Sequence, residues 1–390
     1  VPHHALNSYL AKLIRAGKTA ALCDQVEDPK TAKGLVRREI TRIVTPGTVT
    51  EDGLLDETVN NYIASVSGLA VSILDLSTGE FGVETLKSVE KLDEALERYR
   101  PAELIVSDEE DFSSRGELFA NATRIQSWTF SAEAAYDNLT RHFKVLSLDG
   151  FGLDGKGDAV SAAGALIYYV GSTLRHSLAH VRSLRIMDSG DALVLDSSTI
   201  RHLQLLPYGD VQKGATLLGV LDVTKTPMGA RTMRNWSSRP LARAADVNQR
   251  LDAVGLYVRE RMLLTDLRRL LGGVRDLERL IQKVDSMRAN PRDLKALSLS
   301  LKPIPAIKSS CSLFSIASRL DAEDEIVELT YERGVEDFTL ACGTGSASTA
   351  VTLWLQGKLP GGHLIAENPG GTLQITVEGE NGTVTGLYLE

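Results

Sequence analysis

The spacing of apolar residues changes twice along this chain of 390 residues. Up to about residue 190, short apolar runs with the two-residue period of strands alternate with stretches that have helical spacing. From about residue 197 to 320, apolar positions recur every three or four residues, as in helices that bury one face. Beyond residue 330, glycines crowd together and a paired-strand pattern follows. The pattern predicts a multidomain protein: an α/β part, then an all-α part, then an α+β end.

Individual elements follow from the same spacing. In the first part we predict helices at 5–16, 89–100 and 159–174, and strands at 20–23, 38–44, 63–76, 81–85, 101–106, 184–186 and 193–195. A turn at 77–80 joins two of these strands as a hairpin, and the polar stretch 51–60 is predicted to be a linker. The later helices are predicted at 251–264, 266–271 and 277–287, and a second hairpin at 373–389.

Composition excludes several classes of protein. Apolar residues make up 43% and charged residues 24%, which is typical of soluble globular proteins rather than disordered ones. Three cysteines are too few for a secreted disulfide scaffold, so we expect a cytoplasmic protein. No run approaches the ~20 apolar residues of a membrane helix, and we expect no membrane partner. The first residue is not Met, and we expect the chain to be a fragment.

Charge is unevenly distributed along the chain, whose net charge is −8. Residues 1–50 carry a net charge of +4 and residues 231–300 carry +7, whereas residues 331–390 carry −5. A polyanion would be attracted to the first two regions and repelled by the last. The alternative is that these helices and strands simply have solvated basic faces.

Several motifs in a fixed order resemble one family. They are VPHHALNSYLAKLIRAGKTAALCDQVEDP (1–29), RIVTPGTVTEDGLLDE (42–57), LDLSTGEF (74–81), LDVTKTPMGARTMRNWSSRPL (221–241), DLERL (276–280) and RANPRDLKAL (288–297). Together they resemble the MutS-type DNA mismatch-recognition proteins. The resemblance implies a truncated mismatch-binding α/β lobe at 1–54, a ribonuclease-H-like connector at 55–191 and an incomplete helical core or lever at 192–327.

The resemblance also implies a function. The family probes mismatches with a Phe-x-Glu wedge and binds ATP and Mg²⁺ through a Gly-x-x-x-x-Gly-Lys-Ser/Thr loop, and the 390 residues contain neither motif. We therefore expect no cofactor and weak binding of double-stranded DNA, and a homodimer is left open. The residues carried over as DNA-binding are Lys30, Lys33, Arg37, Arg38 and Arg42.

Other conspicuous residues in this part are predicted to be structural. In the stretch 221–241 we expect packing roles: Asp222 or Thr224 as a helix cap, Met228 and Trp236 as bulk, Gly229 for close packing, and Pro240 as a helix end. A nuclease site in the connector would need several carboxylates around two metal ions. Asp75 is the one strand acid in a suitable place, and a solvated turn acid is the preferred interpretation. His176 and His180 lack an evident third ligand, so no metal site is predicted.

The end of the chain resembles a different family. YERGVEDFTLACGTGSASTAVTLWLQGK (331–358) and NPGGTLQITVEGENGTVTGLYLE (368–390) are similar to the C-terminal half of diaminopimelate epimerase, a cofactor-independent amino-acid isomerase of lysine biosynthesis. This resemblance assigns residues 328–390 to an α+β half-domain, with Cys342 as an acid/base at a helix N-terminus. Glu332, Arg333, Gly343 and Thr344 would bind substrate.

The two resemblances together predict a composite chain. The epimerase family uses a second cysteine in a Cys-Gly-Asn motif, which this sequence lacks, so we expect no racemisation by this chain alone. Three interpretations stay open: a DNA-associated MutS-like fragment, an incomplete epimerase-type enzyme, and a non-functional hybrid with exposed apolar faces.

Overall fold

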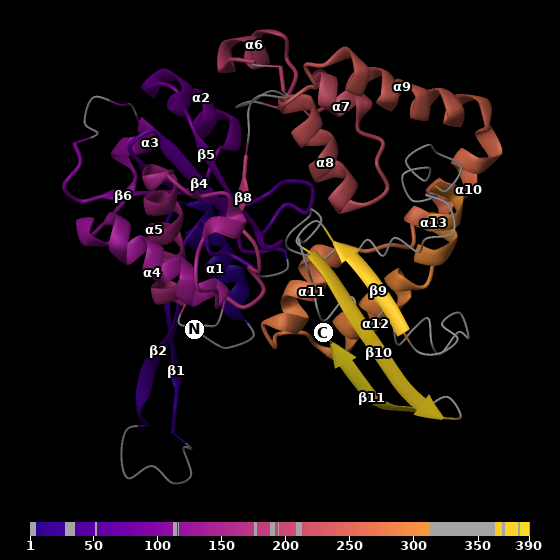
Figure 1. The fold of residues 1–390 in the computed structure, drawn as a ribbon. Coiled ribbons are helices and arrows are strands. Elements are labelled where there is room, and N and C mark those ends of the chain that lie inside the picture. Colours follow the sequence, from indigo (N-terminus) through magenta and orange to yellow (C-terminus); the bar gives the residue numbers. More distant parts are fainter. Residues whose placement is uncertain are drawn as a thin grey trace. The chain divides into compact units, whose positions relative to one another are not determined.

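The chain folds into two compact units, Val1–Ser310 and Cys311–Glu390. The computed structural model describes residues 5–27, 36–50, 53–111, 115, 117–174, 178–187, 192–193, 195–207, 213–311, 363–368, 371–380 and 383–389. Unit 1 begins with α/β structure and continues with helices, as the apolar spacing predicts (Figure 1). The finer division at residues 54, 191 and 327 stays a prediction.

A helix and a two-stranded hairpin open the first unit. The elements are α1 (Leu6–Arg15), β1 (Ala20–Gln25) and β2 (Arg38–Val44), close to the predicted bounds. Leu10 of α1 is buried with Val44 and Val49 in a small apolar cluster. Gly17 follows the helix with a φ of +68°, and its N–H donates to Ile14 O at 2.8 Å. The predicted helix end at Gly17 is therefore confirmed.

A six-stranded mixed sheet forms the centre of the α/β part. Its strands are β3 (Tyr62–Ser67), β4 (Ala70–Asp75), β5 (Glu80–Thr85), β6 (Glu103–Ser107), β7 (Thr123–Ile125) and β8 (Arg185–Ile186). The order across the sheet is β7-β6-β3-β4-β5-β8, with β3, β4 and β5 antiparallel and the outer strands parallel to their neighbours. The hairpin turn predicted at 77–80 joins β4 to β5 and is confirmed.

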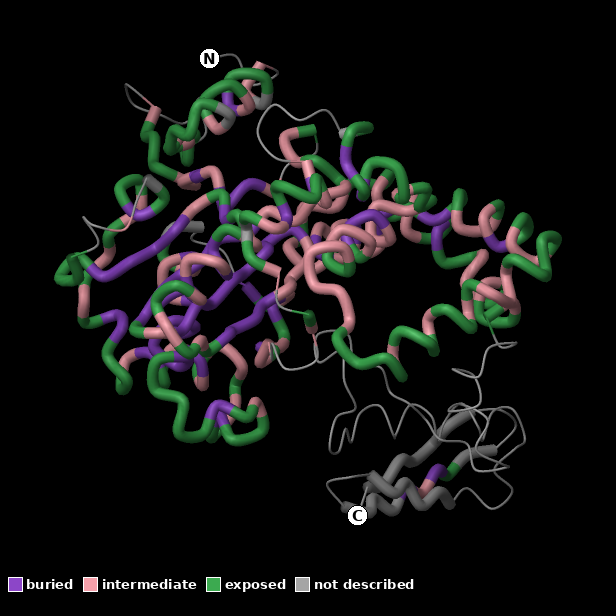
Figure 2. The backbone as a smooth tube through the Cα atoms, turned by 90° about the horizontal axis from the view of Figure 1, so that it is seen from above, coloured by how far each residue is buried: buried purple, intermediate pink, exposed green. Residues whose placement is uncertain are grey.

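Helices cover both faces of this sheet (Figure 1). They are α2 (Val89–Tyr99), α3 (Glu117–Ala120), α4 (Ala132–Phe143) and α5 (Gly157–Leu174), with short 3-10 turns at Ser127–Phe130 and Asp149–Phe151. Because strand side chains alternate, Ile63 faces the α4–α5 layer while the next residue, Ala64, faces the α2 layer. Both faces are covered, so β3 and β4 are buried along their whole length, as the purple strands in Figure 2 show.

The stretch predicted as a single strand at 63–76 is two strands, and that prediction is wrong. The chain reverses at Gly68 and Leu69, where Gly68 has a φ of +53°. A Cβ at Gly68 would lie 2.3 Å from the Asp158 carboxylate, which accepts the Leu69 N–H at 3.2 Å. Apolar residues continue through a two-residue turn that is covered by α5, so the change of direction leaves no polar signal beyond the glycine.

Asp75 is completely buried, so its interpretation as a solvated turn acid is wrong. Its carboxylate accepts hydrogen bonds from Asn60 Nδ2 at 3.0 Å and from the Asn61 N–H at 3.1 Å. Ser77 donates through both its N–H at 2.8 Å and its Oγ at 2.7 Å. Four donors replace water, so Asp75 holds the β4–β5 turn against the start of β3. Glu84 of β5 is a second buried strand acid, which the sequence analysis missed.

Helices make up the remainder of unit 1. They are α6 (Ser197–His202), α7 (Leu217–Leu221), α8 (Pro227–Ser238), α9 (Ala244–Arg259), α10 (Arg261–Leu271), α11 (Leu277–Asp285), α12 (Pro291–Leu301) and α13 (Ile304–Cys311), with a 3-10 turn at Lys213–Ala215. The helix predicted at 251–264 is divided at Glu260 between α9 and α10. Figure 2 shows this region mostly as intermediate and exposed backbone, in contrast to the sheet.

Three finer predictions for residues 193–241 need correction. The helix cap of α8 is Thr226, whose Oγ1 accepts the Gly229 N–H at 3.0 Å, and not Asp222 or Thr224. Trp236 is 47% exposed and stacks under Arg250 instead of filling a core. Residues 193 and 195, the described part of the strand predicted at 193–195, are not in a strand, and Ala192 forms an isolated bridge with Leu241.

The described part of the second unit is a three-stranded antiparallel sheet. Its strands are β9 (His363–Asn368), β10 (Gly371–Glu380) and β11 (Thr383–Leu389), in the order β11-β10-β9. The hairpin predicted at 373–389 is confirmed by the pairing of β10 with β11. Ile375 and Val377 are buried, two residues apart on one face of β10.

Among the described residues, no helix is both long and apolar enough to cross a membrane.

The contact between α4 and α5 provides a test of this architecture. A Cβ at Gly164 would lie 2.4 Å from the backbone of Ala135, which cannot move aside as a side chain can. We expect Gly164→Ala to lower the free energy of unfolding by about 1–3 kcal/mol, measured by urea denaturation. Gly171→Ala on the same helix is the control, because its Cβ would meet only Leu178 Cδ1, at 4.0 Å. Equal effects of the two substitutions would contradict close packing at Gly164.

Candidate functional site: basic residues at the junction of hairpin, sheet and helices

The predicted DNA-binding arginines lie on β2 or, in the case of Arg37, directly before it. Arg37 precedes the strand and is exposed, but it pairs with Glu39, and its N–H donates to Glu27 Oε2 at 3.1 Å. Arg38 is exposed and sits opposite Gln25 of β1. Lys30 and Lys33 lie outside the described residues. Of the arginines, Arg38 therefore presents the charge that is most open to a ligand from solvent.

Arg42 occupies a different environment from Arg37 and Arg38. It is partly buried on β2, and burial, followed by the charge of Arg288, lowers the pKa of its guanidinium to about 10. Arg288 follows α11, and its Nη1 donates to Thr50 Oγ1 at 2.7 Å. The structure thus brings together one arginine from each of the two basic regions of the sequence.

A second arginine contact ties α11 to the stretch that was predicted to be a linker. Arg279 Nη2 donates to the carbonyls of Asp56 at 3.2 Å and Val59 at 3.1 Å. Its Nε donates to Ser77 Oγ at 3.1 Å, in the turn that Asp75 organises. The described residues of this stretch, 53–60, are therefore held against a helix rather than free in solvent.

The most buried charge of the junction is Arg231 of α8. Its two Nη atoms form a bidentate ion pair with Asp276 at 2.7 and 2.9 Å, and Nη2 also bonds Glu278 at 2.5 Å. Nη1 reaches the carbonyl of Glu57 at 2.8 Å. Burial alone would lower the pKa of Arg231, but its bonds to the two carboxylates raise it above the ordinary arginine value. Arg231 is therefore a fixed cation that joins α8, α11 and the 53–60 stretch.

Neither a metal nor a nuclease site is found within the described part of the chain. No group of three or more His, Cys, Asp or Glu side chains could hold a metal ion there. His180 is partly buried, and its burial lowers its pKa, whereas His176 lies outside the described residues. Cys342, Glu332, Arg333, Gly343 and Thr344, the epimerase-like residues, also lie outside them.

Comparison with known proteins follows the same order of parts. Residues 1–53 match MutS domain I, residues 61–182 match MutS domain II, and residues 198–342 match MutS domain III. The DNA mismatch repair protein MutS of Solibacter usitatus is 40% identical over 342 residues, 84% of this chain and 39% of the relative. Its namesake from Protochlamydia amoebophila is 37% identical over 367 residues, 88% of this chain and 42% of the relative.

The chain belongs to the MutS family. It spans about two fifths of the length of these relatives. The MutS domain III match ends at residue 342, so it overlaps the beginning of the segment that resembles the epimerase family. The epimerase-like tail stays a prediction.

The junction residues explain two of the motifs that carry the MutS resemblance. Arg231 lies in the motif 221–241, and Asp276, Glu278 and Arg279 lie in the motif 276–280. The two motifs are bonded to each other through Arg231, across 45 residues of sequence. The sequence analysis gave packing roles to the stretch 221–241, gave none to 276–280, and missed the ion pairs. The excess of arginine in residues 231–300 was the available signal, but it does not say which arginine is buried.

The Arg231 cluster gives a stability prediction. Arg231→Gln should lower the free energy of unfolding by about 3–5 kcal/mol, because it removes the bidentate partner of the buried Asp276 carboxylate and leaves that carboxylate with the longer ion pair to Arg279, at 3.7 Å. Urea denaturation of the full chain measures the change. Arg259→Gln, which removes an exposed arginine of α9, should change stability by less than about 0.5 kcal/mol. A loss at Arg231 as small as that at Arg259 would contradict the role of the cluster.

Proposed function

We propose that this chain is the DNA-contacting N-terminal part of a MutS-type mismatch repair protein. The observation that carries the proposal is the match to MutS domains I, II and III, in that order, over residues 1–342. The relatives over this length are DNA mismatch repair proteins. Double-stranded DNA is therefore the proposed partner, contacted through the basic residues of the hairpin and of the helices beside it.

Charge at the junction supports this assignment. The charge of Arg288 contributes to the lowered pKa of Arg42, so the two guanidinium groups lie close enough to repel each other. The phosphate groups of bound DNA would reduce this repulsion, and binding would release the counterions that surround free DNA. Arg38, exposed on the same strand as Arg42, extends the positive charge toward solvent. The family's ATP and Mg²⁺ require a motif that these 390 residues lack, so the proposal includes no cofactor.

Binding to duplexes of matched and mismatched sequence tests the proposal. We expect weak, salt-sensitive binding to both duplexes by fluorescence anisotropy, with equal affinities because the Phe-x-Glu wedge is not in this sequence. Arg38→Gln should weaken binding to both equally and reduce the slope of log K against log salt by about 1. Arg259→Gln is the matched control, an exposed arginine on α9.

Two outcomes would contradict this proposal. Binding that does not change with salt would exclude phosphate contacts as its source. Tighter binding of the mismatched duplex would show that a probe other than the Phe-x-Glu wedge is present.

A homodimer and a cytoplasmic location stay predictions.

For residues 331–390 we propose descent from the diaminopimelate epimerase family, supported by the Glu-Arg-Gly and Ala-Cys-Gly-Thr-Gly motifs. Cys342 would be the acid/base, and Glu332, Arg333, Gly343 and Thr344 would bind the substrate. The described strands β9 to β11 follow these motifs in the chain. A tail that retains these motifs without a second cysteine is also compatible with a non-functional hybrid.

Solvent deuterium tests for residual chemistry in this tail. We expect no deuterium at the α-carbon of diaminopimelate after incubation with the chain, because a second acid/base cysteine on the opposite face of the substrate is lacking. Mass spectrometry of the recovered amino acid measures the exchange. Exchange that Cys342→Ala abolishes would contradict this expectation and would restore the epimerase-type enzyme as a function of the chain.

A further inference from the structure

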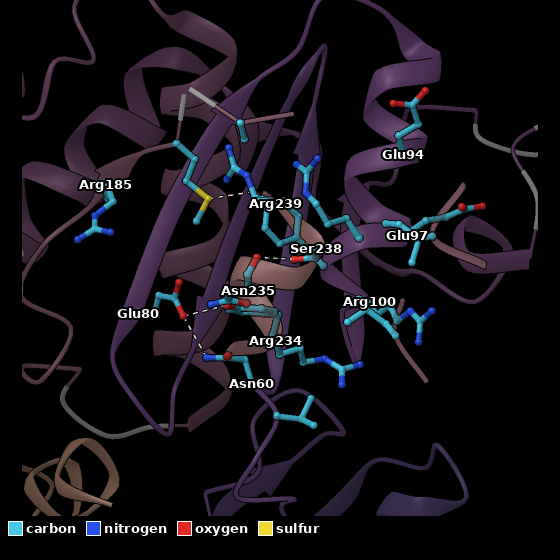
Figure 3. Close-up of a pocket in the computed structure, with 18 of the residues that line it drawn as sticks. Asn60, Glu80, Glu94, Glu97, Arg100, Arg185, Arg234, Asn235, Ser238 and Arg239 are labelled. Carbon is cyan, nitrogen blue, oxygen red and sulfur yellow. Dashed lines mark hydrogen bonds between the residues drawn. The ribbon is translucent and has the colours of Figure 1, made fainter. Parts of the chain in front are cut away.

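A cavity of about 430 Å³ lies between the sheet and the helical part of the first unit (Figure 3). Its walls come from β3, β5, β8, α2, α6 and α8 and from the residues beside them. Small-ligand sites commonly have volumes of about 300–1,000 Å³, so this cavity is large enough for a small organic molecule. Neither the Arg231 cluster nor the β2 arginines line it, although Val59 and Asn60 of the 53–60 stretch do.

The cavity is lined by more positive than negative side chains. Five arginines and three glutamates contribute to its walls. One arginine is already neutralised, since Arg98 pairs with the buried carboxylate of Glu84 at 2.6 Å. On the acidic side, Glu80 accepts hydrogen bonds from Asn60 and Tyr62, and Glu94 pairs with Lys91 at 2.6 Å.

Arg234 of α8 is the cation that the described residues compensate least. It is partly buried, and no hydrogen bond or ion pair to its guanidinium is found within the described part of the chain. Burial, followed by the charge of Arg100, lowers its pKa, and Asp56 offsets this only in part. Figure 3 shows Arg234 and Arg100 beside each other in the cavity, with Asn60 and Asn235 near them. The Asn60 amide already donates to Asp75 and Glu80, and Arg100 Nη1 donates to Pro207 O at 2.9 Å. The two adjacent guanidinium groups and the Asn235 amide nevertheless form a set of donor groups suited to an oxyanion.

Apolar groups complete the wall of the cavity. Ile186, Met187 and Leu206 line it together with the ring of Tyr99, whose hydroxyl bonds Met187 Sδ at 2.9 Å. An inorganic anion would leave this apolar surface in contact with water. An organic anion would cover it, because its apolar part gains from leaving water while its charged part meets the arginines.

We propose that this cavity binds a small organic phosphate, with the phosphate between Arg100 and Arg234 and the organic part against Tyr99, Ile186 and Met187. Phosphate is preferred to a carboxylate because its several oxygens can accept from both guanidinium groups at once. The same chemistry could come from a nucleic-acid backbone. The apolar surface favours a small ester over a continuous strand.

Calorimetry of the full chain with three probes tests the ligand class. Phenyl phosphate should bind saturably and more tightly than inorganic phosphate, and phenol should not bind measurably. Equal affinity for phenyl phosphate and inorganic phosphate would overturn the role of the apolar wall. Displacement of phenyl phosphate by an unphosphorylated single-stranded oligonucleotide, at lower concentrations than by inorganic phosphate, would overturn the assignment to a small ester.

Variants locate the site. Arg234→Gln should weaken phenyl phosphate binding about tenfold or more, which corresponds to the loss of one charge-assisted hydrogen-bond donor. Asn235→Asp places a negative charge at the same wall, on an exposed position where folding is not at risk, and should also weaken binding. Arg259→Gln, outside the cavity, should leave the affinity unchanged. Wild-type affinity in both Arg234→Gln and Asn235→Asp would overturn the proposal.

Discussion

The ion pair between Arg231 and Asp276 is the interaction on which the position of the helical part of the first unit most depends. A guanidinium withdrawn from water is costly unless its donors are satisfied, and here two carboxylates and one carbonyl accept from it. These acceptors come from α11 and from the 53–60 stretch, so the charge of Arg231 is satisfied only while α8, α11 and this stretch remain together. An apolar contact would tolerate sliding of the helices, but a bidentate pair fixes their register.

Polar contacts are important for the position of the helices, because the helical part of the first unit has little buried apolar surface. The sheet between α2 and α5 has large apolar clusters on both faces, whereas α9 has no fully buried residue. Arg279 and Arg288 on and after α11 add further bonds to Ser77 and Thr50. The sheet is thus held by apolar burial, and the helices are positioned against it largely by arginines. Contacts of this kind weaken with salt or with competing anions more than an apolar core does.

Local patterns in the sequence predicted the elements but not the contacts between distant segments. The helix at 159–174 and the hairpins around 77–80 and 381–382 follow from spacing and turn residues alone, and the structure confirms them. Asp75 was placed in solvent because two of its donors come from Asn60 and Asn61, directly before the neighbouring strand β3. The partners of Arg231 lie 45 or more residues away, and no local pattern encodes that pairing. The MutS resemblance supplied the order of the parts but not which charges meet.

The two arginines of α8 show that the effect of burial on a cation depends on which charges lie beside it. Arg231 and Arg234 are three residues apart on one helix, and both leave bulk solvent. Arg231 meets two carboxylates, and its pKa rises. Burial, followed by the charge of Arg100, lowers the pKa of Arg234. The first arrangement stabilises the folded chain, because the cation lowers the energy of the buried acids. The second arrangement is offset only in part by Asp56, so the anion proposed for the cavity would stabilise the folded chain by binding there.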